Sequence, residues 1–553
     1  MSTGTVHQGA KDLIQQGDTL FGRRSSLMSL WQEMADNFYP ERADFTSIRT
    51  LGEDFAAHLS SSYPLVVRRE LGNSISSISR RKDTEWMKMS VKRHEKLDSA
   101  GKEWLEWATT VQRAAMYDPV AKFERSTKEC DHDWATFGQG IISEEINWKT
   151  VALLYRCWHP RDVVWCEDET GGISDRHHNV KPTAKWLCAQ FGDKVHRKVK
   201  ECLGPKKNPH TEINCRRIVM PAHGYDDLTK GRKMPWVSIY IDIDNQWIID
   251  ERPSWTPIYI IPRWQTVSGT QYAYSPASVA GLPDARLIQA MTLTLLEAGE
   301  MSVRPPMLKA GDAIQGEVQL FAGGITNIDA AYDERMGAPL RSVFERTGSA
   351  GNLPFGEELL SRKEEMLARA FYLNKLRALP QKEGMTATEV AQWTRDWIRE
   401  ALPLFEPLES EYNAPVCTQT FEDLMRANAF GPWRDIPQSL RKQDVEWKFQ
   451  SPLSDAIERD KAQKFMEAKA LVLEAAQLDP SVIAMLDARR ATREALAGIS
   501  VPTKWTRDER AVEAHAKQVQ EQQQQQAQLA AAGEGAAAAA DAGAAAESFA
   551  KVA

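Results

Sequence analysis

The chain has 553 residues, of which 42% are hydrophobic and 26% charged, and its formal net charge is −7. The length predicts about three domains. The negative charge argues against a protein that coats nucleic acid non-specifically, although it leaves open DNA that passes through a cavity with few contacts. There is no run of about 18 apolar residues, so we expect no membrane span.

The cysteines and tryptophans indicate the cellular setting and the packing. The seven cysteines are scattered and form no C-x-x-C pair, which indicates reduced thiols in a cytoplasm. The N-terminus is polar and lacks the apolar core of a signal peptide. Thirteen of the eighteen tryptophans precede residue 265, and so many large rings must be buried in cores or between subunits.

The first 140 residues have helical periodicity. Apolar residues at roughly helical spacing predict a helix over 10–40, which a proline stops. Similar patterns predict helices over 56–82 and 97–117, and another from 121 to Gly138. None of these helices carries a chemical signature, so we interpret them as a packing layer.

From about 141 to 265 the apolar period changes to two, and β-branched and aromatic residues become frequent. The predicted strands are Ile141–Trp148, Ala152–Cys157, Val163–Cys166, Arg217–Pro221, Trp236–Ile243, Gln246–Glu251 and Tyr259–Arg263. Asp244-Asn245 fits a hairpin turn, and apolar spacing predicts a helix over 182–202. We therefore expect an α+β fold with an antiparallel sheet.

A long apolar helix follows the strands. Asp284 can cap a helix that runs to about Val303, which corresponds to a length of about 30 Å. Its apolar stripe consists of Leu287, Ile288, Met291, Leu295 and Ala298, and Leu293 and Leu296 lie off the stripe. A helix that is apolar over most of its circumference needs neighbours on more than one side. Pro305-Pro306 ends it.

A second long helix is predicted over 356–378, after about fifty residues that have the pattern of strands and turns. Its apolar face consists of Leu359, Leu360, Met366, Leu367, Ala370, Phe371 and Leu373, and charged residues cover the rest. After a short loop, Thr386 and Glu389 have the spacing of a capping box and start a third helix.

The C-terminal part is mostly helical by pattern. A single strand over Val445–Phe449 is expected to rejoin the earlier sheet, and helices are expected over 454–477, 480–498 and 505–530. The last residues are rich in Gln and Ala and have no apolar face to bury. We expect disorder there, and the alternative is a helical barrel between subunits.

Sequence motifs for nucleotide binding and for nucleophilic catalysis are missing. The spacing of Gly4 and Gly9 resembles a phosphate-binding loop, but Ala10 stands where the lysine is required. There is no G-x-G-x-x-G, no G-x-S-x-G and no paired Cys and His that indicates a nucleophile. We expect no enzyme and no cofactor.

Clusters of histidine and carboxylate residues do not have the spacing of a metal site. His132 near Cys130 and the pair His177-His178 lack a second pair of ligands, and we interpret them as hydrogen-bonded surface histidines. The run Glu167-Asp168-Glu169 is interpreted as an acidic loop between strands. We predict no metal.

Short motifs surround the long helices in a definite order. They are Tyr-x-x-Ser-Pro…Leu-Pro-Asp-x-x-x-Leu (Tyr272, Ser275, Pro276, Leu282, Pro283, Asp284, with Ile288 in the last slot), then Pro305-Pro306, then Thr-Ala-Thr-Glu-Val at 386–390. Supporting motifs are Asn37-Phe38-Tyr39-Pro40, Trp158-His159-Pro160-Arg161-Asp162 and the Gln/Ala-rich tail. In these motifs and their order, over roughly 10–500, the chain resembles the portal, or head-to-tail connector, proteins of short-tailed bacteriophages. Ala273 is a departure, because such proteins often carry Gly there.

The resemblance implies a ring, expected to be a homododecamer, around a channel through which double-stranded DNA is packaged and later ejected. It implies a wing (1–270), a first stem helix (271–305), a clip (306–354), a second stem helix (355–378), a channel loop (379–385), a wing helix and strand (386–450), crown helices (451–505) and a tail that is disordered or a helical barrel (506–553). The implied partners are further copies of the chain, the terminase large subunit, capsid and scaffolding proteins and tail adaptors. The implied location is the portal vertex of the virion, and the host cytoplasm during assembly.

The resemblance also implies roles for single residues. The candidates for the DNA channel are Gln381, Lys382, Glu383, Lys375, Arg377, Arg362 and Lys363, and those for subunit packing in the stem are Leu287, Ile288, Met291, Leu295, Met366, Leu367 and Phe371. Alternatively, the stem cations pair with Glu357, Glu358 and Glu364 between neighbouring helices, and 379–385 is a plain helix–helix turn.

Two other interpretations of function remain open. The chain could be a different virion structural or tail-adaptor protein. It could also be a metal-dependent DNA-processing enzyme that uses Glu167, Asp168 and Glu169, in which case replacing them would abolish metal-dependent cleavage.

Overall fold

The chain divides into two units, which are described separately. The first comprises Met1–Met87, Val111–Phe430 and Phe449–Leu453, and the second comprises Lys88–Thr110, Gly431–Lys448 and Ser454–Ala553. The computed structural model describes residues 9–50, 52–92, 97–147, 152–205, 207–225, 234–303, 307–309, 344–346, 353–376, 406–441, 443–450 and 452–475, with short runs between 477 and 525.

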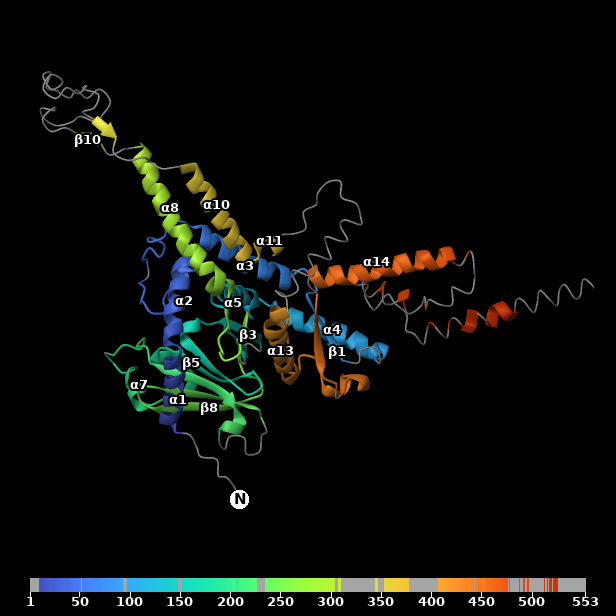
Figure 1. The fold of residues 1–553 in the computed structure, drawn as a ribbon. Helices are drawn as coiled ribbons and strands as arrows, with labels where there is room; N and C mark the ends of the chain where they lie inside the picture. Colours follow the sequence, from blue (N-terminus) through green and yellow to red (C-terminus); the bar gives the residue numbers. More distant parts are fainter. Residues whose placement is uncertain are drawn as a thin grey trace, which may run out of the picture. The chain divides into compact units, whose positions relative to one another are not determined.

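A five-stranded antiparallel sheet in the first unit has the strand order β4-β5-β6-β7-β8 (Figure 1). Its strands are β4 Val163–Glu167, β5 Ile173–Val180, β6 Cys215–Pro221, β7 Trp236–Asp242 and β8 Trp247–Ser254. The predicted strands are confirmed here, and β5 is an addition. The sequence of β5, ISDRHHNV, has no apolar alternation, and so the pattern did not reveal it.

Each face of this sheet is covered by other elements. Leu13 and Ile14 of helix α1 (Ala10–Arg23) pack on Ile218 and Ile239 on one face. The opposite face carries Val219, which packs with Trp165 and with Tyr259 of β9 (Tyr259–Ile260). A smaller antiparallel sheet has the order β3-β2-β9, with β2 at Ile142–Asn147 and β3 at Ala152–Cys157.

The N-terminal helices are shorter than their sequence pattern predicts. The segment expected as one helix over 10–40 is α1 and α2 (Ser25–Phe38), with a break at Arg24. Arg24 is buried, and its guanidinium donates hydrogen bonds to the carbonyls of Pro160 (2.7 Å) and Val163 (2.8 Å). The break allows this arginine to reach those carbonyls. The following helices are α3 Tyr63–Ser79, α4 Ser99–Met116 and α5 Phe123–Phe137.

The prediction of a single helix over 182–202 is wrong, because this segment forms two shorter helices. The structure has α6 (Ala184–Phe191), a 3-10 turn and α7 (Arg197–Glu201). Gly192 separates them with φ of 56°, a left-handed value that favours glycine.

Two strands near the boundaries of the second unit form a separate two-stranded sheet. They are β1 Met87–Val91 and β12 Val445–Phe449. The expectation that 445–449 rejoins the earlier sheet is therefore wrong, because its partner is β1, which the sequence pattern did not identify. Helix α14 spans Pro452–Ala475, close to the predicted 454–477. The later predicted helices and the Gln/Ala-rich tail lie mostly outside the described residues.

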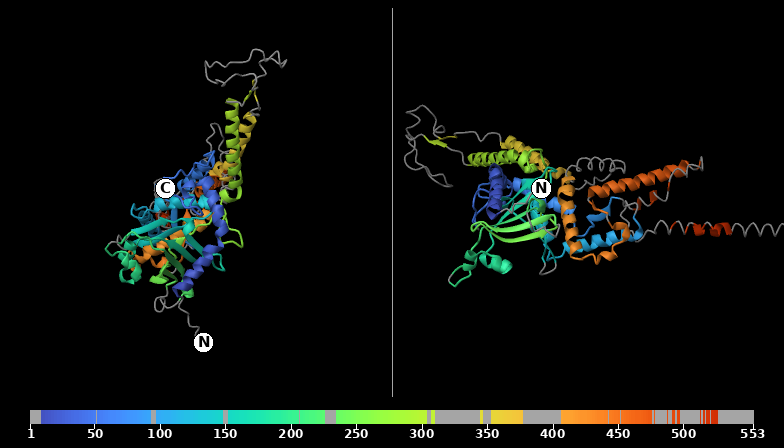
Figure 2. Two further views of the ribbon diagram at one scale, coloured as in Figure 1. Left: turned by 90° about the vertical axis from the view of Figure 1, so that its left-hand side faces the viewer. Right: turned by 90° about the horizontal axis from the view of Figure 1, so that it is seen from below.

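A pair of long helices extends away from the sheets of the first unit (Figures 1 and 2). A π-helical turn, η6 (Ala277–Gly281), leads into α8 (Leu282–Val303), and α10 (Leu353–Ala370) returns alongside it. Short strands β10 (Met307–Lys309) and β11 (Phe344–Arg346) pair antiparallel between them in the sequence. Most of the predicted clip, 306–354, lies outside the described residues.

Candidate functional site: the helix pair and its base

Helices α8 and α10 pack closely along their length. A Cβ atom on Gly356 would lie 2.5 Å from Cδ2 of Leu295, so a larger residue here would displace the Leu295 side chain. Lys363 of α10 places its Nζ 3.5 Å from Oδ1 of Asp284. The prediction that Asp284 caps α8 is wrong, because the helix begins at Leu282 and Asp284 lies inside its first turn. Ile288 and Leu367 are fully buried within one chain.

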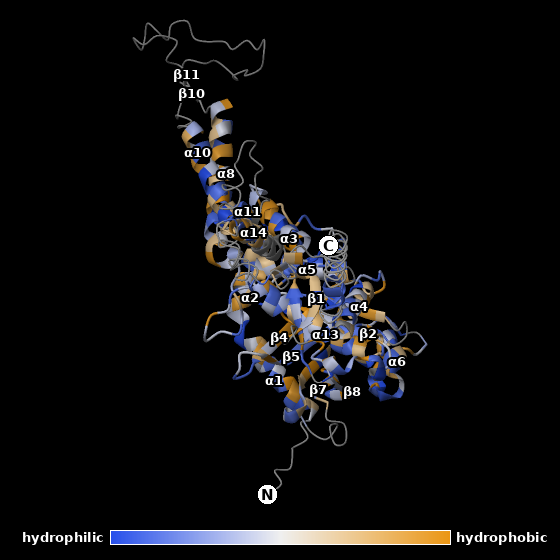
Figure 3. Ribbon diagram, turned by 90° about the vertical axis from the view of Figure 1, so that its right-hand side faces the viewer, coloured by the Kyte–Doolittle hydropathy of each residue, from blue (hydrophilic) through white to orange (hydrophobic). Residues whose placement is uncertain are grey.

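Other apolar side chains of the pair face solvent in a single chain, and Figure 3 shows apolar stretches on both helices. Met366 is 50% exposed, Leu296 is 57% exposed and Val303 is 81% exposed. Further exposed apolar residues of the pair are Leu287, Leu293, Met301 and Leu359. Of the predicted packing residues, Ile288, Leu367 and Phe371 are buried, Met291 and Leu295 are half-buried, and Leu287 and Met366 are exposed.

The charged face of α10 carries ion pairs within the helix. Arg362 pairs with Glu358 at 2.5 Å and Arg369 pairs with Glu365 at 2.6 Å, both four residues apart. Arg362 therefore contacts one of the carboxylates weighed as its partner, on its own helix, whereas Lys363 contacts Asp284. Lys375 lies with its Nζ 5.9 Å from the ring centroid of Tyr372. The remaining predicted channel and cap residues, Arg377, Gln381, Lys382, Glu383, Thr386 and Glu389, lie outside the described residues.

The base of the pair contains a sharp break that the sequence pattern did not predict. The helix expected over 356–378 ends at Ala370, and α11 (Leu373–Leu376) follows. Tyr372 between them has φ of 57°, an unusual value for a bulky residue. Its ring stacks on Trp264 at 6.3 Å between centroids, and these contacts hold the strained residue in place.

The buried ring of Phe371 anchors this break in the body of the first unit. It contacts Phe38 with centroids 5.3 Å apart. A Cβ on Gly281 would lie 2.8 Å from Phe371 and 3.2 Å from Phe38, so the glycine before α8 is required by both rings. The end of α2, the start of α8 and the end of α10 thus meet at one place.

The Tyr-x-x-Ser-Pro motif connects α8 to helices α2 and α5. The Tyr272 ring contacts Trp31 at 5.8 Å and Trp165 at 4.7 Å. Ser275 Oγ donates a hydrogen bond of 2.6 Å to the carbonyl of Thr136, at the end of α5. Tyr272 and Ser275 therefore each have a structural partner in the helical layer.

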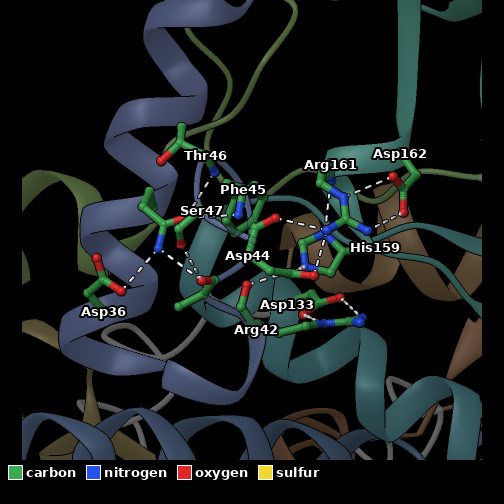
Figure 4. Close-up of polar contacts among 12 residues, drawn as sticks. Asp36, Arg42, Asp44, Phe45, Thr46, Ser47, Asp133, His159, Arg161 and Asp162 are labelled. Carbon is green, nitrogen blue, oxygen red and sulfur yellow. Dashed lines mark hydrogen bonds and ion pairs between the residues drawn. The ribbon is translucent and has the colours of Figure 1, made fainter. Parts of the chain in front are cut away.

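The Trp-His-Pro-Arg-Asp turn lies beside the segment that follows α2 (Figure 4). His159 Nε2 and Arg161 reach the Asp44 carboxylate at 2.7 Å and 2.5 Å. Burial would raise the pKa of Asp44, but the hydrogen bonds and charges of His159 and Arg161 outweigh it and lower the pKa to about 2. Nearby, Arg42 binds the fully buried Asp133 at 2.6 Å. The ion pairs of His159 and Arg161 therefore attach this turn to Asp44, four residues after the Asn-Phe-Tyr-Pro motif.

The interpretation of the histidines as surface residues is wrong. His177 and His178 of β5 are buried, and burial lowers the pKa of each to about 3. His132 is also buried, and burial lowers its pKa to about 4. His178 Nδ1 hydrogen-bonds with the Tyr259 hydroxyl at 2.8 Å, whereas the buried Nδ1 of His177 has no hydrogen-bond partner among the described residues.

The acidic run belongs to the connection between β4 and β5, as expected. Glu167 pairs with Arg263 at 2.6 Å. Asp168 accepts hydrogen bonds from the amides of Thr170 (2.8 Å) and Gly172 (2.9 Å) within its turn. Across the described ranges, no group of three or more His, Cys, Asp or Glu residues is placed to hold a metal ion.

A buried acid pair is a feature that sequence spacing could not reveal. Glu144 of β2 is fully buried, and the Asp423 side chain on α13 (Ala414–Arg426) is 15% exposed. The pKa of Glu144 is raised well above its usual range, mainly by burial and secondly by the charge of the neighbouring Asp423. Burial also raises the pKa of Asp423, to about 6. The pair therefore retains a proton at pH values where isolated carboxyl groups are ionised. The two residues are 279 positions apart, so only the fold brings them together.

Comparison with known proteins places the chain among the structural proteins of the bacteriophage virion. It belongs to the family described as "Bacteriophage head to tail connecting protein", whose model matches residues 10–506. A curated relative, the "Probable portal protein" of Bordetella phage BPP-1, is 22% identical over 492 residues, which cover 87% of this chain and 85% of the relative. The resemblance drawn from the motifs is confirmed.

Two solved structures also show a weak likeness. One is described as "Neck of empty GTA particle computed with C6 symmetry" (TM-score 0.36, 9% identity, 74% of this chain and 86% of that chain). The other is "Virion of native gene transfer agent (GTA) particle" (TM-score 0.31, 8% identity, with the same coverage). TM-scores this low carry no argument. In the described part of the chain, no helix has the length and apolar character needed to cross a membrane.

Proposed function

We propose that the chain forms a homododecameric portal ring, through which double-stranded DNA is packaged and ejected. The observation that carries the proposal is the exposure of apolar side chains on both α8 and α10, such as Leu296 and Met366. Exposed apolar area on a helix pair that already buries Ile288 and Leu367 is stabilised when further copies of the pair cover it.

Net charge supports a conduit with weak DNA contact. Twelve copies of a chain with net charge −7 carry −84 in total. Many phosphate contacts would hold the duplex in place, whereas transport requires weak contact. We assign the few channel contacts to the predicted set, Gln381, Lys382, Glu383, Lys375, Arg377, Arg362 and Lys363.

The remaining parts of the proposal follow the family architecture. Residues 1–270 and 386–450 form the wing, 271–305 and 355–378 the stem, 306–354 the clip, 379–385 the channel loop and 451–505 the crown, with 506–553 as the tail. The clip receives a separate terminase ATPase, and other faces receive capsid, scaffolding and tail-adaptor proteins. The assembly takes place in the host cytoplasm.

Oligomeric state tests the proposal directly. Native mass spectrometry and negative-stain microscopy should find closed rings at several salt concentrations. Leu293→Asp with Leu296→Asp should leave a folded chain that does not form rings, because both side chains are exposed within one copy. Val279→Asp, at another exposed apolar position, is the matched control and should still form rings. Only monomers or dimers of the unmodified chain would refute the proposal.

A further inference from the structure

The connection between β5 and β6 is much longer than two neighbouring antiparallel strands need. Antiparallel neighbours can be joined by about 2–5 residues, but residues 181–214 intervene here and contain α6 and α7. This segment, called the helical connection below, has its own apolar core against the sheet. That core includes Leu187, Val195, Val199 and Ile249. α7 lies at the margin of the first unit, away from the helix pair (Figure 1).

The helical connection has the opposite charge to the rest of the chain. It contains eight Lys or Arg residues and three Asp or Glu residues, a net charge of +5. Since the whole chain carries −7, the remainder carries −12. A basic segment in an acidic protein attracts an acidic partner and repels a basic one.

Two half-exposed tryptophans lie on this basic surface. Trp186 of α6 is 46% exposed, and its ring contacts Phe191 at 6.0 Å. Trp247 of β8 is 47% exposed, and its Nε1 donates a 2.9 Å hydrogen bond to the carbonyl of Lys194. Trp247 therefore borders the turn that follows α6, and Trp186 contacts the last residue of α6 before that turn. Contacts within the chain hold both rings.

Several cations here are already paired, and others are not. Lys194 binds Asp250 at 2.5 Å, and Lys200 binds Asp193 at 3.1 Å. Lys181, Lys185 and Lys198 are exposed and make no ion pair within the residues that the structure describes. The surface thus combines exposed indole rings with three available ammonium groups.

We propose, on the basis of the proposed role in the virion, that this face of the helical connection is a docking surface for an acidic segment of another virion protein, which packs apolar side chains against Trp186 and Trp247. Protein–protein interfaces have aromatic residues near their centre and polar or charged residues around the rim. The two half-exposed tryptophans and the lysines around them have this composition. An acidic protein segment that carries an apolar side chain matches both the cations and the indole rings, whereas the phosphates of a duplex would match only the cations. This difference favours a protein partner.

Lysine reactivity in assembled particles tests the proposal. Acetylation by an N-hydroxysuccinimide ester of acetate, read by mass spectrometry, should be at least tenfold slower at Lys185 and Lys198 in DNA-free particles than in the purified chain. Equal reactivity in the two samples overturns the proposal. Protection that is already present in purified oligomers assigns the face to a second copy, and protection that requires packaged DNA assigns it to nucleic acid. Both outcomes also overturn it.

Zero-length crosslinking with a carbodiimide supplies a second, independent measurement. In particles, Lys185 or Lys198 should link to Asp or Glu of a different polypeptide, and Trp186→Ala should reduce the yield at least fivefold. Lys181→Glu should also lower the yield at Lys185 and Lys198, because it removes one of the three cations that attract the acidic segment. Lys128→Glu, an exposed change on α5, is the matched control and should leave the links intact. An unchanged yield in Trp186→Ala contradicts the role of the indole.

Discussion

The buried acid pair of Glu144 and Asp423 predicts that stability falls as the pH rises. The pKa of Asp423 is about 6 in the folded chain, against an ordinary value of 3.8. Between these values the folded state binds more protons than the unfolded chain, so stability is lost as the pH rises through this window. At about 1.4 kcal/mol for each pKa unit, the loss from Asp423 is at most about 3 kcal/mol and is nearly complete at pH 7. The raised pKa of Glu144 adds a loss in the same direction that extends to higher pH.

Asp423→Asn removes this titration and keeps the volume of the side chain. We expect the variant to match the parent near pH 4 and to exceed it at pH 8 by up to about 3 kcal/mol. The variant also loses a 3.5 Å ion pair with Arg426, which is partly exposed and contributes about 0.5 kcal/mol or less. Urea unfolding, followed by tryptophan fluorescence at pH 4, 6 and 8, gives the free energies to compare.

Glu422→Gln is the matched control, because Glu422 lies next to Asp423, is partly exposed and also pairs with Arg426. Its difference from the parent should stay within about 0.5 kcal/mol at every pH. If the difference between Asp423→Asn and the parent changes by less than about 1 kcal/mol from pH 4 to pH 8, the shared-proton account is refuted.

Three further predictions concern the helix pair and its base. Gly356→Val should force Leu295 aside and destabilise the chain by about 1–3 kcal/mol, seen as a lower melting temperature, whereas an unchanged melting temperature contradicts the close packing. Arg42→Ala should cost about 3–5 kcal/mol by leaving the buried Asp133 charge unpaired, and Asp133→Ala in the same chain should recover part of the loss, which a double-mutant cycle measures. Deleting 380–385 should leave rings intact in micrographs but impair DNA packaging or retention, and fully packaged, stable heads would contradict the proposed channel loop.

Much of the local structure could be predicted from the sequence. Apolar period two located most strands of the five-stranded sheet, and Ala152–Cys157 has the bounds expected for it. The long apolar stripe of α8 and its acidic first turn predicted a helix that begins near Asp284 and ends at Val303. These features depend on neighbouring residues, which periodicity and capping describe directly.

The errors share a physical cause. β5 was missed and His177 was placed on the surface because the burial of polar residues depends on partners from distant elements. The second long helix was predicted to continue past Tyr372, whose left-handed backbone is held by contacts with Trp264. Local propensity is overridden where tertiary contacts supply more free energy than one strained residue costs.

The sequence by itself determined the kind of elements, their order and, through short motifs in that order, the family. Only the tertiary structure decided which residues meet: Phe371 with Phe38 at the base of the helix pair, His159 with Asp44, and Glu144 with Asp423. It also decided which apolar residues of α8 and α10 remain exposed in one chain. Exposure and charge pairing arise when side chains from distant parts of the chain pack together. The linear sequence pattern therefore does not reveal which residues are exposed or paired.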